Sequence, residues 1–192
     1  MRPSPRTTSV GVCLLSALAL SLLPVDRASA QSNSPVPQVG AVAPDFTVPA
    51  ATRYGVLQDE IHLSDFRGKT VVLAFFPKAR TQGCTIQMHA YRDQYAELFH
   101  SGQDVVLIAM SMDSAEDLYS WAKDDQFQFV MASDMGGSVA ESYGASRGPI
   151  ANRYLFVIAP DGTIAHTMIP FAEVDPTSYE ALGQAIDGIA TQ

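Results

Sequence analysis

The sequence predicts an α/β domain of three layers, with helices on both faces of a mixed central sheet. Two continuous apolar runs, Val71–Phe76 and Val105–Met110, have the pattern of strands buried on both faces, which is typical of parallel strands. Further along, Tyr154–Ile158 and Thr163–Met168 flank the turn residues Pro160-Asp161-Gly162 and predict an antiparallel hairpin. Helix-like segments separate these strands, and this alternation with a closing hairpin indicates the three layers.

The remaining elements follow from local patterns. Asp45–Val48 is expected as an edge strand and Phe127–Met131 as a short strand. A helix beginning at Ser114 is favoured because Asp113-Ser114 is followed by Glu116-Asp117, which suits a helix first turn. Pro176 suits the first turn of a last helix, where a missing N–H costs little. The expected helices are Cys84–Phe99, Ser114–Asp124, Gly137–Tyr143 and Pro176–Ile189.

Composition excludes several classes of protein. The 192 residues include 12 Lys+Arg and 20 Asp+Glu, for a net charge of −8, so the chain lacks the basic surface of a nucleic-acid binder. Its 2 cysteines, Cys13 and Cys84, are too few for a disulfide scaffold or a cysteine-rich zinc site. The 4 histidines show no metal-ligand spacing, and there is no phosphate-binding glycine motif. We therefore expect no metal and no cofactor.

The first thirty residues have the pattern of a secretory signal peptide. Basic Arg2 and Arg6 precede the apolar run Val10–Leu23, and Ala28-Ser29-Ala30 is a small-residue cleavage site. The apolar run is shorter than the roughly 20 residues of a membrane span, although an uncleaved anchor is the alternative. Cleavage would leave Cys84 as the single cysteine of an exported protein, periplasmic or secreted, without stable membrane insertion. The expected organisation is a removed signal peptide at 1–30, a flexible lead-in at 31–41 and a domain at 42–192.

The sharpest local chemistry surrounds Cys84. This residue lies where the strand ending at Phe76 gives way to a helix, and the unpaired N–H groups of a helix start favour an anion such as a thiolate. Thr81, three residues earlier, is close enough for its hydroxyl to reach the sulfur or a ligand oxygen, and Pro77 can wall one side. A buried, inert cysteine is the alternative, and the local sequence leaves both open.

A wider set of motifs resembles the peroxiredoxins, the alkyl hydroperoxide reductase/thiol-specific antioxidant family. Pro77-x-x-x-Thr81-x-x-Cys84 resembles their active-site motif, Val42–Phe46 their A-P-D-F opening, and Leu63–Lys69 their L-S-D-x-x-G-K segment. Phe75–Ala79 resembles the F-Y-P-K-A of the bacterioferritin-comigratory, or peroxiredoxin Q, branch. The resemblance spans about residues 40 to 190. It implies a thioredoxin-like fold.

The resemblance also implies an activity and a set of site residues. It implies a thiol-dependent peroxidase that reduces hydrogen peroxide or organic hydroperoxides through a sulfenic acid on Cys84. Arg153, just before the strand that precedes the Pro160-Asp161-Gly162 turn, occupies the place of the family's arginine. A guanidinium there would stabilise the thiolate and donate to the peroxide oxygens. The expected catalytic residues are Cys84, Thr81, Pro77 and Arg153, with Thr81, Gly83 and Arg153 binding the substrate.

The chain departs from the branch at three positions near the reactive cysteine. His89 stands where a resolving cysteine is frequent, Gln87 where a glutamate is frequent, and Gln82 where a proline is frequent. Without a second cysteine, recycling needs an external thiol of the thioredoxin, glutaredoxin or small-thiol type. His89 is interpreted either as a base near the site or as a solvent-facing helix residue.

Alternatives remain for the arginine and for the function. Arg147 and Arg80 are weaker candidates for the arginine role. The alternative functions are an exported peroxide sensor, a thioredoxin-like binding module without turnover, or an inert fold with a vestigial motif.

Overall fold

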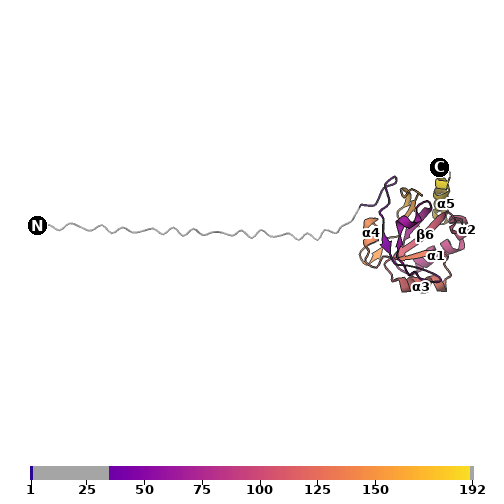
Figure 1. Ribbon diagram of the computed structural model, residues 1–192, viewed down its shortest axis with the longest axis horizontal. Helices are drawn as coiled ribbons and strands as arrows, with labels where there is room; N and C mark the ends of the chain where they lie inside the picture. The colour runs from indigo at the N-terminus through magenta and orange to yellow at the C-terminus, as the bar shows by residue number, and fades with distance from the viewer. Residues whose placement is uncertain (2–34, 191–192) are drawn as a thin grey trace. The chain divides into compact units, whose positions relative to one another are not determined.

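The computed structural model describes Met1 and residues 35–190, and it confirms the mixed central sheet (Figure 1). The sheet has seven strands in the order β11-β10-β5-β6-β7-β2-β3. Its centre is parallel, formed by β5 (Thr70–Phe75), β6 (Val105–Ser111) and β7 (Val130–Ser133). Every residue of β5 is buried, which explains its uninterrupted apolar sequence.

Antiparallel strands complete both edges of the sheet. On one side β10 (Leu155–Ile158) pairs with β5 and forms the expected hairpin with β11 (Ile164–Met168). On the other side β2 (Ala50–Thr52) pairs with β7 and then with β3 (Gly55–Val56).

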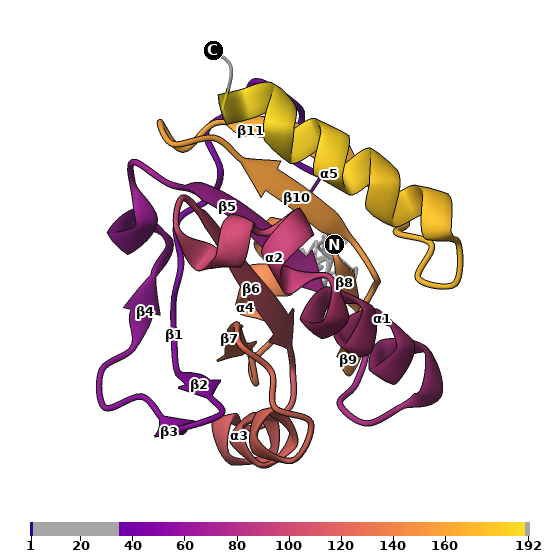
Figure 2. The ribbon, with the colours of Figure 1, turned by 90° about the vertical axis from the view of Figure 1, so that its right-hand side faces the viewer.

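Four helices share one apolar cluster on one face of the sheet, and Figure 2 shows three of them, α1, α2 and α5, in front of the strands. Trp121, Tyr91, Met88 and Leu182 are among the fully buried side chains of this cluster. The short helix η2 (His100–Gly102) follows α2. The four helices are α1 (Gln82–Asp93), α2 (Tyr95–Leu98), α3 (Ala115–Asp124) and α5 (Pro176–Ala190).

The opposite face is covered by short elements around a second apolar cluster. Phe75, Tyr143 and Phe156 pack ring against ring there, and the Tyr143 hydroxyl donates to the carbonyl of Pro44 at 2.7 Å. The covering elements are α4 (Ser138–Ser142), the 3-10 helix η1 (Leu63–Phe66), and two small sheets made of β1 (Thr47–Val48) with β4 (Ile61–His62) and β8 (Ser146–Arg147) with β9 (Ile150–Ala151). Helices therefore lie on both faces, as predicted.

Three expected elements differ in detail. The edge strand expected at Asp45–Val48 is β1, which pairs with β4 in a separate two-stranded sheet. The helix expected over Cys84–Phe99 is divided at Gln94 into α1 and α2. The strand expected at Phe127–Met131 begins only at Val130, because the N–H of Phe127 donates to the carbonyl of Ala122 at 2.9 Å instead of pairing with a strand. The helix expected from Ser114 begins at Ala115, and Ser114 caps it, since its hydroxyl accepts from the backbone N–H of Asp117 at 3.1 Å.

The expected signal peptide lies, apart from Met1, outside the described residues, and so does the start of the lead-in. The rest of the lead-in runs beside β11: Gly40 donates its N–H to Ile164, and Ile164 donates to Ala41, each at 2.8 Å. Across Met1 and residues 35–190, no helix combines the length and the apolar character that crossing a membrane requires.

Candidate active site

The reactive-cysteine motif occupies the junction between β5 and α1. Cys84 is the third residue of α1, and its side chain is fully buried. Thr81 is the residue that caps the helix, with extended backbone angles (φ −79, ψ 154), and its carbonyl accepts the first helical bond from Thr85 at 2.8 Å. Because the first N–H groups of a helix lack intrahelical acceptors, the start of α1, where Cys84 stands, favours an anion.

The loop before Cys84 is fixed by a carboxylate from the end of β6. The backbone N–H of Ala79 donates to Asp113 Oδ2 at 2.7 Å, and the hydroxyl of Ser111 donates to the same oxygen at 2.8 Å. The sequence interpretation assigned Asp113 to the start of the following helix, whereas its side chain holds the loop of the reactive cysteine. Burying a backbone donor in this way requires a strong acceptor, which a carboxylate provides.

Arg153 is the cation that reaches Cys84. It lies between β9 and β10, and its Nη2 is 3.6 Å from Cys84 Sγ. Its side chain is only 13% exposed, so most of the guanidinium is removed from water. The sequence analysis named this arginine, and the fold brings it beside a residue that is distant in the chain.

A buried polar chain continues from Arg153 into α1. Arg153 Nη1 donates to Gln87 Oε1, and Gln87 Nε2 donates to the hydroxyl of Tyr91 at 2.9 Å. Both Gln87 and Tyr91 are fully buried, and burial raises the pKa of Tyr91 well above its usual range, so it stays protonated. Gln87 is thus an internal support of the guanidinium.

Glu173 is the site residue that the sequence analysis missed. It lies in the loop between β11 and α5, and its Oε2 is 3.1 Å from Arg153 Nε, with the carboxylate side chain 23% exposed. The same carboxylate lies against Gly83: a Cβ added there would meet Glu173 Oε1 at 2.6 Å and Arg153 Nη2 at 3.0 Å. Gly83 therefore makes room for both charged groups.

The other expected site residues have these positions. The Thr81 hydroxyl donates to the carbonyl of Lys78 at 2.9 Å, so its proton is already used while its oxygen can still accept. Pro77 is half-buried and follows Phe76, the residue after β5. Arg147 is exposed in β8, and Arg80, in a left-handed conformation (φ 60), forms an ion pair with Asp124 at 2.6 Å.

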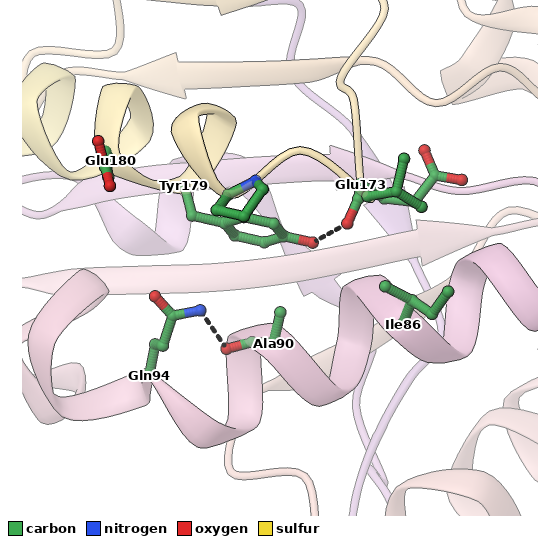
Figure 3. Close-up of a pocket in the computed structure, with 8 residues that line it drawn as sticks. Ile86, Ala90, Gln94, Glu173, Tyr179 and Glu180 are labelled. Atoms are coloured by element: carbon green, nitrogen blue, oxygen red, sulfur yellow. Dashed lines mark hydrogen bonds between the residues drawn. The ribbon is translucent and has the colours of Figure 1, made fainter.

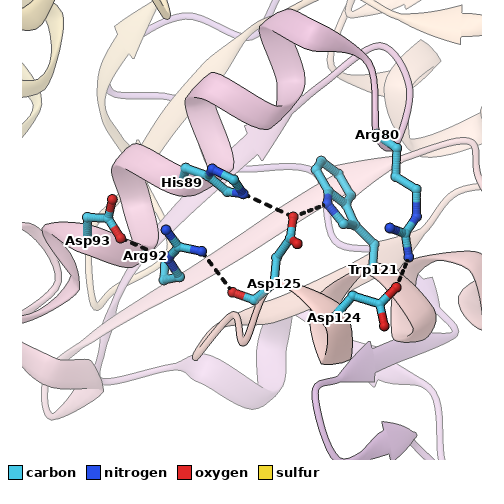
Figure 4. Close-up of polar contacts among 7 residues, drawn as sticks. All are labelled: Arg80, His89, Arg92, Asp93, Trp121, Asp124 and Asp125. Atoms are coloured by element: carbon cyan, nitrogen blue, oxygen red, sulfur yellow. Dashed lines mark hydrogen bonds and ion pairs between the residues drawn. The ribbon is translucent and has the colours of Figure 1, made fainter.

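His89 belongs to a separate polar cluster that joins α1 to the end of α3 (Figure 4). Its Nε2 is 3.0 Å from Asp125 Oδ2, which also accepts from Trp121 Nε1 at 2.6 Å, while Arg92 donates to the Asp125 carbonyl at 3.1 Å. Burial opposes the charge of Asp125, but the bonds from His89 and Trp121 outweigh it and hold the pKa of Asp125 below its usual value. His89 thus acts as a contact between helices in this structure.

A groove of about 490 Å³ lies between α1 and the start of α5, next to the buried site (Figure 3). Its apolar lining includes Ile86, 39% exposed, and Val174, 71% exposed, and its acidic residues are Glu173 and Glu180. Glu173 is therefore shared between the groove and the contact with Arg153. Among Met1 and residues 35–190, no cluster of three or more His, Cys, Asp or Glu side chains is arranged to hold a metal ion.

The chemistry available here is that of a positioned thiol. The adjacent Arg153 guanidinium and the start of α1 both favour negative charge on the sulfur and on an oxygen leaving it. A general base would serve only to remove the thiol proton. Once the sulfur is ionised, the thiolate itself is the nucleophile and needs no base beside it.

Comparisons with known proteins agree with this chemistry. Residues 39–167 match the AhpC/TSA family. Peroxiredoxin Bcp of Escherichia coli K12 is 32% identical over 142 residues, covering 70% of this chain and 86% of that protein. The chloroplastic peroxiredoxin Q of Triticum aestivum is 32% identical over 160 residues, covering 78% and 69%. The crystal structure of peroxidoxin BcpB from Mycobacterium tuberculosis superposes with a TM-score of 0.68 at 25% identity, covering 80% and 98%.

Proposed function

The chain belongs to the AhpC/TSA family, in the branch of peroxiredoxins Bcp and Q, and we propose that Cys84 is the residue that attacks the peroxide. The chain is a thiol-dependent peroxidase. The observation that supports Cys84 is its place at the start of α1 with Arg153 Nη2 at 3.6 Å from the sulfur.

The proposed first step oxidises the sulfur. The Cys84 thiolate attacks the distal oxygen of hydrogen peroxide or an organic hydroperoxide, so an S–O bond forms as the O–O bond breaks. The departing hydroxide or alkoxide takes up a proton and leaves as water or an alcohol, and Cys84 becomes a sulfenic acid. Arg153 donates to the oxygens as charge develops, and the Thr81 oxygen, whose own proton goes to Lys78, accepts from the peroxide O–H.

Regeneration is proposed to need an external thiol. The sequence holds Cys13 and Cys84 only, and Cys84 is free. A first thiol condenses with the sulfenic acid, releasing water and leaving a mixed disulfide, and a second thiol then displaces Cys84. The second thiol reaction returns the enzyme and releases the oxidised reductant as a disulfide. Thioredoxin-like, glutaredoxin-like and small thiols all satisfy this chemistry.

Peroxide consumption by the protein with a dithiol donor tests this function. Wild type should turn over many times, whereas Cys84→Ser should consume hydrogen peroxide only at the rate of the buffer. Repeated turnover also separates a peroxidase from a sensor, which is oxidised once. Equal consumption by Cys84→Ser and wild type would contradict the proposed role of Cys84.

We also propose that the enzyme works after export, in the periplasm or outside the cell. The support is the basic start, the apolar run Val10–Leu23 and the site Ala28-Ser29-Ala30. N-terminal sequencing of the protein from its native host should find Gln31 first. A mature protein that begins at Met1 would refute the cleavage.

A further inference from the structure

The carboxylate of Glu173 forms an ion pair with Arg153, the cation that contacts the sulfur of Cys84. Arg153 Nε is 3.1 Å from Glu173 Oε2, while its Nη2 is 3.6 Å from Cys84 Sγ. The second carboxylate oxygen lies against Gly83, beside the start of α1. Glu173 therefore lies where the positive charge of Arg153 and of the helix start would otherwise attract an anion.

A hydrogen bond to the backbone carbonyl fixes each residue of the ion pair. The N–H of Phe171 donates to the carbonyl of Arg153 at 2.8 Å, and the hydroxyl of Tyr179 donates to the carbonyl of Glu173 at 2.8 Å. Burial, with the nearby Glu173 carboxylate, raises the pKa of Tyr179 to about 12, so this donor persists across the physiological range. The side chains are 13% and 23% exposed, so solvent screens the pair only in part.

We propose that Glu173 is a specificity-determining residue that disfavours anionic peroxides and anionic thiol reagents at Cys84. Neutral peroxides meet a site where Glu173 balances the charge of Arg153, whereas an anionic peroxide is repelled by the Glu173 carboxylate. Glu180 lines the same groove and adds a second negative charge on that side. This inference rests on the proposed role of Cys84 and adds the charge class of its substrate.

Glu173→Gln tests the inference with little change of shape. The amide oxygen can still accept from Arg153 Nε, so the variant removes the charge while keeping the contact. Two matched pairs of probes are used on each protein. The first is a small alkyl hydroperoxide with a carboxylate on its chain and the methyl ester of the same compound. The second pair is iodoacetate, which is an anion, and iodoacetamide, which is neutral; both alkylate Cys84.

The measured quantity is the ratio of the anionic to the neutral rate constant. We expect Glu173→Gln to raise this ratio about tenfold for both pairs at low salt, the lower end of electrostatic effects on association. Added salt should raise the wild-type ratio towards that of the variant, because screening weakens the repulsion. Glu180→Gln is the control: it removes an exposed charge from the same groove and should change the ratios less.

The outcomes separate this inference from the proposed function. If Glu173→Gln changes both members of each pair equally, Glu173 only supports the structure and the inference is wrong. If Glu180→Gln has the same effect as Glu173→Gln, general surface charge is the cause and the inference is again wrong. Failure of the peroxidase assay leaves the alkylation ratio measurable, because alkylation needs only the thiol.

Discussion

Replacing Arg153 by Met tests the catalytic arrangement most directly. The methionine keeps much of the side-chain bulk but removes the charge and every donor of the guanidinium. Three contacts disappear: Nη2 to Cys84 Sγ at 3.6 Å, Nε to Glu173 Oε2 at 3.1 Å, and Nη1 to Gln87. The loss affects both the ionised sulfur and the transition state.

The expected size of the effect follows from those contacts. Removing one preorganised donor to a developing oxyanion costs about 10²–10³ in rate, and we expect peroxide reduction by Arg153→Met to slow by that factor. Glu173 and Gln87 are left mostly buried without their partner, which should cost about 1–3 kcal/mol of folding stability. Because the loss of stability could also lower the measured rate, the rate must be measured under conditions where wild type and Arg153→Met are both folded.

Stopped-flow measurement of sulfenic acid formation at several peroxide concentrations gives the rate constant, and a thermal melt confirms folding. Arg153→Lys should recover part of the rate, since an ammonium restores the charge without the planar fork that serves three partners. Arg147→Met is the matched control, because Arg147 is exposed in β8. A rate for Arg153→Met equal to that of wild type, with a slowed Arg147→Met, would assign the role to Arg147 instead.

Three further predictions concern packing, pH and oxidation. Gly83→Ala should slow peroxide reduction about tenfold to a hundredfold, because its Cβ would displace the Glu173 carboxylate, while Gly136→Ala, which meets nothing within 4 Å, should not. Burial opposes the charge of His100, but bonds to Asp104 and Asp187 outweigh it and raise its pKa. Its stabilisation of about 0.5 kcal/mol should therefore be present below about pH 6 and lost as pH rises through the raised pKa, so His100→Gln should lose stability in denaturant melts at mildly acid pH and little at alkaline pH. Excess peroxide without a thiol should convert the reactive cysteine to sulfinic and sulfonic acids, whereas an intramolecular disulfide seen by intact mass spectrometry would show that a second cysteine is retained.

The centre of the fold was predictable because burial dictates its sequence. The strands β5, β6 and β10 are buried almost throughout, so continuous apolar runs identify them. The start of α3 was predictable to within one residue because the Ser114 hydroxyl needs only the N–H of a residue three positions later. In both cases, the determining interactions are local or shared by a whole run of residues.

The short elements were not predictable for the opposite reason. β2, β3, β4, β8 and β9 each contain only two or three residues, too few to establish a period of alternation. The break at Gln94 between α1 and α2 has no proline or glycine to mark it. Tertiary packing of Tyr95, Leu98 and Phe99 sets the second helix instead.

The candidate site also contains residues that the sequence could nominate and one, Glu173, that only the fold places. Cys84 and Thr81 lie in one short motif, and the resemblance to the family named Arg153 by its place before a strand, so the sequence could nominate these residues. Glu173 has no such marker: it follows the hairpin in a loop, and only the fold places it 3.1 Å from Arg153 Nε. Arg153 beside a thiolate would by itself be expected to attract anions. Its charge is balanced by Glu173, which comes from a different loop. The proposed nucleophile thus lies in a short motif, whereas the proposed selection of substrates by charge depends on a contact between residues of two different loops.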